Sequence, residues 1–254
     1  MSPSFRTRNG RLHAILRWGY QPLKYSIAAL GDLAATRRYR RRILDYLRQD
    51  GFKGLQIGSG KVFHKGWLNT DMFGSDGIKT DTEIGAAVNI EKPLPFPDGS
   101  FDAIYGAEVV EHIPRESVGP FLIEARRVLR PSGVLRLTTP NARAVCELYL
   151  GTHKKSKLEE HFSTWLEAEA NPEFWLNAMF RFWGHKWVWD PDSLCVLMRS
   201  SGFKFTTLVE PQKTRSGMKE LENLDIRYGV PAPPYAWTSS MIVEASAERD
   251  LSEK

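Results

Sequence analysis

Short apolar runs, separated by turns and by one amphipathic segment, dominate the middle of the chain. Over 118–129 the apolar residues repeat at helical spacing, and the "RPSG" that follows is a typical stop signal. The runs typical of strands lie at 55–57, 67–72, 87–90, 101–107 and 134–139. Strand, helix and strand in this order predict a parallel sheet with right-handed crossovers.

Further elements flank this region. The stretch "ATRRYRRRILDYLRQDG" predicts a helix that ends at Gly51 and places Tyr39, Ile43, Tyr46 and Leu47 on one face. Near the C-terminus, Asp190 as N-cap and Pro191 at the first helical position predict a helix that closes at Gly202. The segments "KFTTLVE" and "SSMIVEASA" alternate or run apolar, so we expect them to pair as an antiparallel hairpin at the sheet edge.

The predicted fold is therefore α/β, a doubly wound and mostly parallel seven-stranded sheet with an antiparallel edge strand. A polar and aromatic stretch with five of the eight tryptophans interrupts it and predicts a helical insertion, which would form a lid over a bound ligand. The expected organisation is a basic helical extension at 1–50, a ligand-binding half at 51–150, the insertion at 151–189, a C-terminal part at 190–248 and a tail at 249–254.

Composition and charge narrow the class of protein. With 254 residues and 42% hydrophobic residues, the chain can bury one core, or one core with an appended subdomain. The net charge of +5 is concentrated at the N-terminus, where residues 1–50 hold ten Arg and one Lys against three Asp. A solvated helical face is the plain interpretation, and contact with anionic lipid, nucleic acid or an acidic partner is the other. No apolar stretch approaches the roughly 20 residues of a membrane span.

The N-terminus and the cysteines bear on location. The segment before Asp32 is rich in Arg and free of acids, as in a transit peptide or a peripheral membrane-surface helix, and it lacks the order of a secretory signal. Cys146 and Cys195 fall in predicted helices without metal-like spacing. We therefore expect two inert buried thiols, no metal site, and a cytoplasmic protein, with peripheral contact at the inner membrane face left open.

The stretch "GLQIGSGKVFHKGWLNTDMF" carries the first functional signal. Glycines at 58 and 60 follow a predicted strand and let the backbone approach a ligand at the carboxyl end of the sheet, where open parallel sheets bind ligands. Asp71 ends the next strand and can accept hydrogen bonds from both hydroxyls of a ribose. It could instead cap a loop, and Asp76 and Asp81 are rival carboxylates.

The connection between these two strands is unusually short. Only residues 61–66 separate Gly60 from Trp67, whereas a parallel crossover normally takes a dozen or more residues. A full helix does not fit this length, so we expect a loop or a single turn.

Two later segments, "LPFPDGSFDAIYGAEVVEHIP" and "EARRVLRPSGVLRLTTPN", follow in an order and at a distance that resemble the class I S-adenosylmethionine (SAM)-dependent methyltransferases. The resemblance is to the methyltransferase type 11-like branch that acts on small molecules and glycans. It is specific over 55–141, weaker in "HKWVWDPDSLCVLMRSSGF", and says little about 1–45 or 145–184. It implies a Rossmann-like fold and methyl transfer from SAM.

The resemblance also implies roles for individual residues. The glycine turn would pass beneath the methionine part of SAM, Asp71 would bind the ribose, Asn89 with the following Ile90 would face the adenine, and the segment at 107–108 would line the methionine moiety. Val62 stands near the place of the family's third glycine, and Asn89 where an aspartate is common; Asn89 could also be a turn residue. The implied cofactor-binding residues are Gly58, Ser59, Gly60, Asp71, Asn89, Ile90, Ala107 and Glu108.

A hydroxyl acceptor would also need a base. His112 is the first candidate and His185 the second, with His161 and Glu111 behind them, although His112 could be a structural histidine. The tryptophan-rich segment suits sugar rings or aromatic and lipidic bodies, though single tryptophans more often serve packing. We therefore expect O-methylation of a glycan or glycolipid-like acceptor.

Other functions share part of this pattern. A methyltransferase for a small aromatic or lipidic metabolite would carry every motif, and a non-catalytic partner-binding module would fail to bind SAM. We do not expect a nucleic-acid partner, because the sequence has neither an Asn-Pro-Pro-aromatic motif nor a cysteine placed as a pyrimidine nucleophile. Salt-dependent binding of the protein to RNA or DNA would instead favour a nucleic-acid methyltransferase. An aminopropyl transferase would need an acidic channel for a polyamine, and the tryptophan-rich segment does not have that composition.

Overall fold

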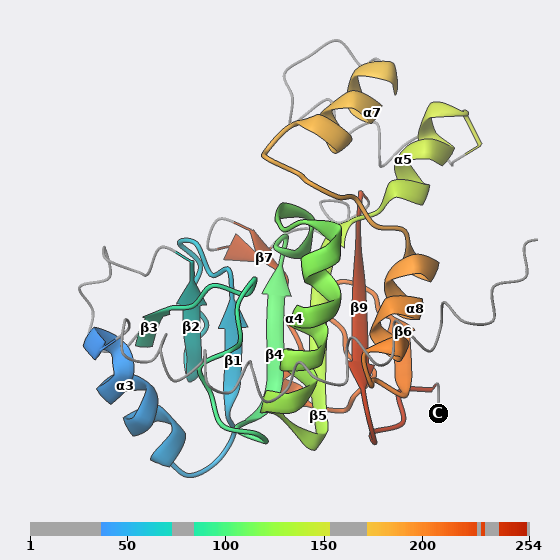
Figure 1. Ribbon diagram of the computed structural model, residues 1–254. Helices are drawn as coiled ribbons and strands as arrows, with labels where there is room; N and C mark the ends of the chain where they lie inside the picture. The colour runs from blue at the N-terminus through green and yellow to red at the C-terminus, as the bar shows by residue number, and fades with distance from the viewer. Residues whose placement is uncertain (1–36, 73–83, 153–171, 228–229, 232–238, 253–254) are drawn as a thin grey trace, which may run out of the picture.

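The computed structural model describes residues 37–72, 84–152, 172–227, 230–231 and 239–252. Seven of its strands form one sheet in the order β3-β2-β1-β4-β5-β9-β6 (Figure 1). These strands are β1 (Gly54–Ile57), β2 (Trp67–Asp71), β3 (Ile84–Ala87), β4 (Phe101–Ala107), β5 (Leu129–Pro140), β6 (Phe205–Leu208) and β9 (Ser240–Ser246). The α-helices are α3 (Arg37–Arg48), α4 (Arg115–Val128), α5 (Ala142–Tyr149), α7 (Pro172–Arg181) and α8 (Pro191–Ser200).

Short elements complete the described chain. They are two 3₁₀ turns, η1 (Val110–His112) and η2 (Lys219–Leu221), and a small two-stranded sheet of β7 (Ile226–Arg227) and β8 (Val230–Pro231). Residues 1–36, with most of the predicted basic extension, lie outside the described residues, as do Asp76, Asp81, His161 and Trp165.

Strand directions confirm the predicted mostly parallel seven-stranded sheet. The pairs β1–β2, β1–β4, β2–β3 and β4–β5 are parallel. The predicted hairpin is also confirmed, since β6 and β9 pair antiparallel. Because β9 pairs antiparallel with β5 as well, the antiparallel strand lies one place in from the edge and β6 forms the edge itself.

Several element boundaries follow the local signals. β4 spans the predicted residues, and the Asp190 carboxylate caps α8 by accepting from the N–H groups of Asp192 and Ser193. The prediction of a strand at 87–90 was wrong, because β3 ends at Ala87 and the Asn89 side chain accepts from the Glu91 N–H in a turn. β5 begins at residue 129 rather than 134, since Leu129 already pairs with Phe101 across a bulge.

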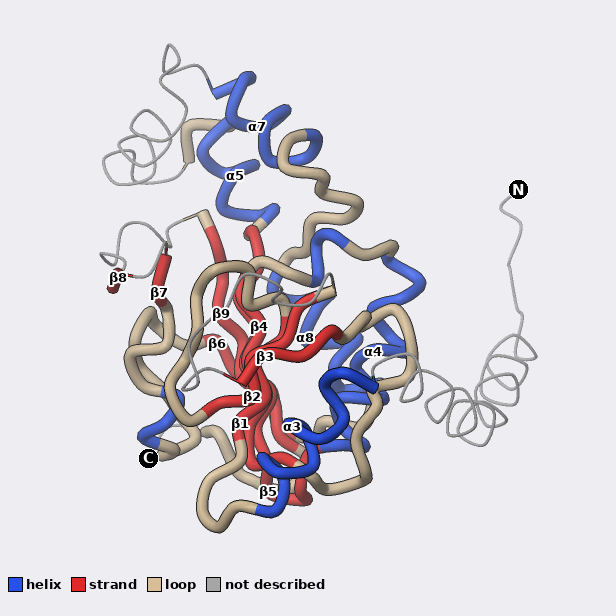
Figure 2. The backbone as a smooth tube through the Cα atoms, turned by 90° about the vertical axis from the view of Figure 1, so that its left-hand side faces the viewer, coloured by secondary structure: helices blue, strands red, loops and turns tan. Residues whose placement is uncertain are grey.

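One face of the sheet is covered by α3, α4 and α8 (Figure 2). The Tyr46 hydroxyl on α3 accepts from the Gly54 N–H at 2.8 Å and lies 3.0 Å from the Gly66 carbonyl oxygen, which fastens the helix to both β1 and the first crossover. Burial raises the pKa of Tyr46 to about 12. Core residues of this face include Ile43, Tyr46, Leu55, Ile57, Phe121, Leu122, Leu194 and Met198.

Loops cover the opposite face in the described residues. The first crossover is a loop, as expected, and side-chain amides hold it where a helix would otherwise pack: the Gln56 amide donates to the Val62 carbonyl, and Asn69 exchanges hydrogen bonds with the backbone of His64. His64 is 7% exposed and its ring packs on Tyr105. The loop therefore buries its own side chains against the sheet.

A buried charge cluster fixes the segment at 209–227 on this face. Arg136 on β5 donates to Asp225 at 2.6 Å and to Glu244 on β9 at 2.8 Å, and all three side chains are fully buried. The two carboxylates also accept from the backbone N–H groups of Gln212 and Arg215. The segment between β6 and β9 is thus held on the sheet by the hydrogen bonds of Asp225 and Glu244.

Within the predicted insertion, α7 packs on α5, the helix that precedes the insertion, and the two helices lie beyond the carboxyl edge of the sheet (Figure 1). Their shared core holds Val145, Leu148, Trp175 and Met179. Cys146 lies on the opposite side of α5 and is exposed, so the expectation of two buried thiols was wrong for this residue. Cys195 on α8 is half-buried, and burial raises the pKa of its thiol.

No helix in the described part of the chain is long and apolar enough to span a bilayer. The side chains of Arg41, Arg42 and Arg48 on α3 are exposed: that of Arg41 is 94% exposed and pairs with Asp45 four residues on. This agrees with the plain interpretation of a solvated helical face for this part of the extension.

Replacing Arg136 with Met is expected to cost about 3 to 5 kcal/mol of unfolding free energy, because Asp225 and Glu244 stay buried without their cation. Urea unfolding measures the loss. The matched control is Arg130→Ala on the same strand, which removes an ion pair of Asp102 with a 45% exposed arginine and is expected to cost at most about 1 kcal/mol. Equal losses in the two variants would contradict a structural role for the buried cluster.

The stability of the protein is expected to fall with acid through His64. Burial lowers the pKa of His64 from 6.5 to about 4, so the unfolded chain binds the proton first. The contribution is complete above pH 6.5 and is lost as the pH falls toward 4. Between pH 7 and 5, urea unfolding should show about 1 to 2 kcal/mol more loss for the wild type than for His64→Asn. The same pH dependence in both proteins would rule this contribution out.

Candidate active site

The Gly-Ser-Gly turn lies directly after β1 and has the backbone that its glycines predict. Gly58 and Gly60 adopt φ values of +61° and +53°. A Cβ on Gly58 would lie 2.4 Å from the side chain of Val109, whereas the Cβ position of Gly60 meets nothing within 4 Å. Gly58 is therefore required by packing, and the backbone at Gly60 stands open to a ligand.

Asp71 is brought to this turn. The Gly60 N–H donates to its Oδ2 at 3.0 Å, and the Ser59 N–H donates to the carbonyl of Thr70 at 2.9 Å. The Ser59 hydroxyl is buried and has no hydrogen-bond partner among the described residues. An unpartnered donor beside an open glycine and a carboxylate suits a polar, hydroxyl-bearing ligand.

The other predicted cofactor-binding residues follow the neighbouring strands. Asn89 and Ile90 come just after β3, where the Val88 N–H donates to the Asp71 carbonyl. Ala107 ends β4, and Glu108 follows with φ +53° and donates its N–H to the Thr138 carbonyl. Since β3, β2, β1 and β4 are parallel neighbours, all eight residues meet at one carboxyl edge.

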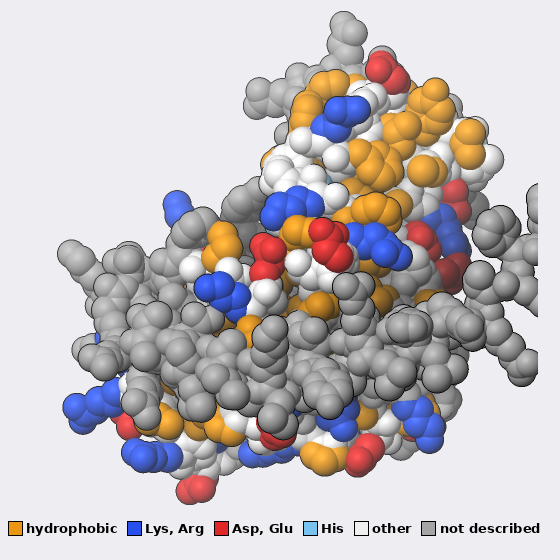
Figure 3. All heavy atoms as spheres, in the orientation of Figure 1, with side chains coloured by type: hydrophobic (Ala, Val, Ile, Leu, Met, Phe, Trp, Pro, Cys, Tyr) orange, Lys and Arg blue, Asp and Glu red, His pale blue; other side chains and the backbone are white. Residues whose placement is uncertain are grey.

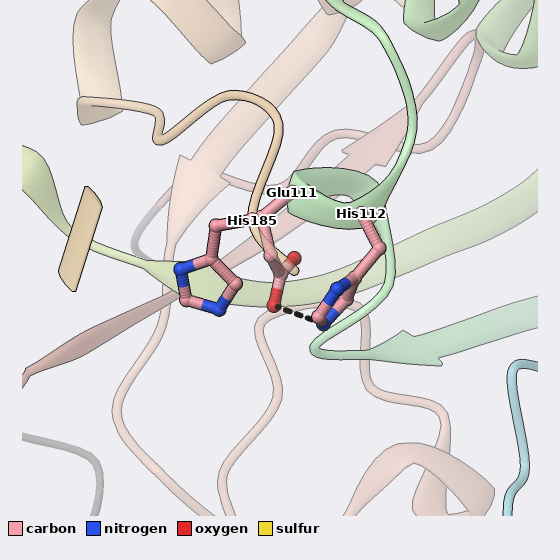
Figure 4. Close-up of side chains that lie close together, drawn as sticks. All are labelled: Glu111, His112 and His185. Carbon is pink, nitrogen blue, oxygen red and sulfur yellow. Dashed lines mark ion pairs between the residues drawn. The ribbon is translucent and has the colours of Figure 1, made fainter. Parts of the chain in front are cut away.

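Both predicted catalytic histidines lie together beyond β4. The rings of His112, on η1, and His185, after α7, are 5.1 Å apart between centroids. The backbone carbonyl of Glu111 causes this approach, because it accepts from the N–H groups of Lys186 and Trp187 and so holds the end of the insertion against η1. Figure 4 shows the Glu111 carboxylate between the two imidazoles.

Glu111 is the centre of this group. Its side chain is fully buried, its Oε2 accepts from the Thr139 hydroxyl at 3.0 Å, and its Oε1 lies 3.9 Å from His112 Nε2. Burial raises the pKa of Glu111 well above its usual range, and the charge of Glu108 raises it further. Burial also lowers the pKa of His112, and His185 lowers it further.

Exposed aromatic side chains lie in the same segment as His185. Trp183 lies 5.6 Å from the His185 ring, and the Arg115 guanidinium stacks on Trp187 at 5.3 Å. Trp175 and Trp189 are buried packing residues, whereas Trp183 and Trp187 are exposed. Figure 3 shows hydrophobic side chains gathered over α5 and α7. Lys186, which lies between Trp183 and Trp187 in the sequence, forms an ion pair with Glu91 at 3.8 Å. This ion pair links the tryptophan-bearing segment to the loop after β3.

The sequence indicated Glu111 only as a base candidate behind the histidines, and it did not identify Thr139 or Lys186 as residues of the site. The adjacent "EH" of "VVEHIP" was the available signal for Glu111, but nothing in the local pattern predicts a fully buried carboxylate. The contacts of Thr139 and Lys186 depend on strand order and on the return of the insertion to η1.

Comparisons with known proteins find similarity to methyltransferases over part of the chain. Residues 75–137 match the family model described as "Methyltransferase domain". The chain is 33% identical over 85 residues to 2-methyl-6-phytyl-1,4-hydroquinone methyltransferase of Synechocystis sp.. That alignment covers 34% of this chain and 26% of the relative. It is 44% identical over 48 residues to a "Probable S-adenosylmethionine-dependent methyltransferase" of Mycolicibacterium smegmatis, covering 19% of this chain and 18% of that one.

Among solved structures, a SAM-dependent methyltransferase from Thermotoga maritima aligns over 87% of this chain and 96% of its own, at 17% identity and a TM-score of 0.47. The chain spans about a quarter or less of the length of the two curated relatives. The family match starts after Asp71, so the glycine turn and the short crossover that follows it lie outside the matched residues.

Gly58→Ala is expected to cost about 2 to 3 kcal/mol of unfolding free energy, because the new methyl group would overlap Val109 at a left-handed φ. Gly60→Ala, with the same handedness and open space, should cost only about 1 kcal/mol. In a Val109→Ala background the cost of Gly58→Ala should fall toward that of Gly60→Ala. Urea unfolding of the four variants measures these differences, and a cost that does not change in that background would contradict the contact.

Residues 75–137, which run from before β3 into β5, are therefore similar in sequence to a methyltransferase domain.

Proposed function

We propose that the protein transfers the methyl group of SAM to a hydroxyl of a glycan or glycolipid-like acceptor. The observation that carries the proposal is the shared edge of the sheet. The glycine turn with Asp71 lies at the ends of β1 and β2, and Glu111, His112 and His185 lie beyond the end of β4, next to β1.

The residues present fit SAM. The open backbone at Gly60 and the unpartnered hydroxyl of Ser59 suit the methionine part, with Ala107 and Glu108 on the adjacent strand end. Asp71 would accept from the ribose hydroxyls. Asn89 and Ile90 would face the adenine, although the Asn89 side-chain oxygen already accepts from the Glu91 N–H, so its role as an acceptor is shared with the turn.

SAM, when bound, supplies an activated sulfonium methyl group. The chain's own task is then to hold the acceptor in line with that group, which can be worth roughly 7 to 11 kcal/mol of barrier. The hydroxyl must also lose its proton, and a placed base typically adds about 10² to 10⁴ in rate. His112 and His185 are the proposed bases, and the exposed rings of Trp183 and Trp187 would form the wall against which an acceptor ring lies.

A second acceptor class has its own support. The Synechocystis relative is named for a hydroquinone, and the exposed aromatic wall would suit a phenolic or lipidic body as well as a sugar. We keep the glycan acceptor first because of its agreement with the sequence resemblance. The proposed location is the cytoplasm, with a peripheral contact of the basic N-terminal segment with the inner membrane face.

Calorimetric titration of S-adenosylhomocysteine, the demethylated product, tests the cofactor site. The wild type should bind with micromolar affinity, and Asp71→Asn should weaken binding at least tenfold, about 1.4 kcal/mol, because the ribose contact loses its charge. Asp45→Asn on the solvent face of α3 is the matched control and should bind as the wild type does. Absence of binding at millimolar ligand would favour a non-catalytic partner-binding module.

Release of S-adenosylhomocysteine in the presence of candidate acceptors tests the substrate class. Oligosaccharides and glycolipids with free hydroxyls form one panel, and prenylated and simple phenols form the other. Turnover with the first panel is expected. Turnover confined to the phenols would overturn the glycan proposal and leave the methyltransferase intact.

A further inference from the structure

Glu111, His112 and His185 are close enough to share one ligand. Each offers a ligand atom, and the three atoms lie within 4.8 Å of one another. They come from two distant parts of the chain, η1 and the segment after α7, which the backbone of Glu111 joins (Figure 4).

Both imidazoles are oriented by backbone groups. His185 donates from Nδ1 to the Met179 carbonyl at 2.6 Å, since a carbonyl can only accept. The His112 ring is hydrogen-bonded to the backbone of Gly184 and turns its Nε2 toward Glu111. A ring N–H held by a backbone carbonyl leaves the other nitrogen as a lone-pair donor, which is the usual outer arrangement of metal-bound histidine.

Glu111 supplies an independent observation. Its side chain is fully buried, Oε1, the oxygen that faces His112, accepts no hydrogen bond from a donor in the described residues, and the nearby Glu108 carboxylate disfavours the charged form of Glu111. A buried carboxylate is costly unless it is paired or binds a metal. The Thr139 hydroxyl holds the other oxygen, so the carboxylate is oriented as well as buried.

We propose that Glu111, His112 and His185 bind one divalent transition-metal ion, with Zn²⁺ the best match to the donor set. Two imidazole nitrogens and one carboxylate oxygen are a common three-residue set of catalytic zinc sites, which leave a further coordination position open. Imidazole ligands also suit Fe, Ni and Cu. This inference replaces the expectation of no metal site, which rested on the absence of a local spacing motif.

The role of the metal rests on the proposed function. An acceptor hydroxyl at the open position would have its pKa lowered by the cation, as a metal-bound water does. The two histidines would then act as metal ligands rather than as free bases. The metal site itself requires no methyl donor, so its test is separate from that of SAM binding.

The test is a titration of the full chain, first freed of metal by a chelator and dialysis, with Zn²⁺ in competition with a chromophoric chelator. The wild type should bind one ion per chain with submicromolar affinity. His185→Ala and Glu111→Gln should each weaken that binding at least tenfold. The matched controls, His64→Gln in the core and Glu116→Gln at the exposed start of α4, should bind as the wild type does.

Absence of a stoichiometric site in the wild type, or equal affinity of His185→Ala, would overturn the proposal. Far-UV circular dichroism checks that each variant is folded. His185 is only half-buried, so its variant carries the test if Glu111→Gln does not fold. If the site binds Zn²⁺ but methyl transfer is the same in the metal-free protein, the catalytic role fails and the site stands.

Discussion

The parallel pairing of β1 with β4 determines where the glycine turn and the segment that leads to Glu111 lie. Ile57 pairs with Gly106, and a Cβ on Gly106 would come within 2.8 Å of the Ile57 side chain, so the two strands require a glycine at this point. The next residues along each strand are Gly58 and Ala107, and Val109 then packs on Gly58. The proposed cofactor turn and the segment that leads to Glu111 are therefore built against each other.

The opposite face of the sheet explains how so short a crossover is tolerated. Side-chain amides of Gln56 and Asn69 bind the backbone of the loop after β1, and the aromatic rings of Trp67 and Tyr105 fill the space beneath it. Farther along the same face, the buried Arg136 cluster fastens the excursion after β6. Hydrogen bonds from buried side chains and a buried ion-pair cluster thus take the place of helix packing on this face. Burying such groups carries a desolvation cost.

Local chemistry predicted the elements whose signals are local. The Asp190 cap and the glycine turn follow from single residues and their immediate neighbours, and the limits of β4 follow from a mostly apolar run between Ser100 and Glu108. The start of β5 and the exposure of Cys146 did not follow, because they depend on a pairing across a bulge and on which side of α5 faces α7. The meeting of His112 with His185 likewise required the insertion to return to η1, which no spacing in the sequence encodes.

A crystal structure of the protein with S-adenosylhomocysteine bound tests the central claim most directly, namely that the glycine turn and the histidine cluster serve one reaction centre. We expect the ribose hydroxyls to lie on Asp71 and the sulfur atom to face the group of Glu111, His112 and His185. A nucleoside bound away from the carboxyl edge of β1 and β2, or a sulfur atom turned away from the histidines, would contradict it.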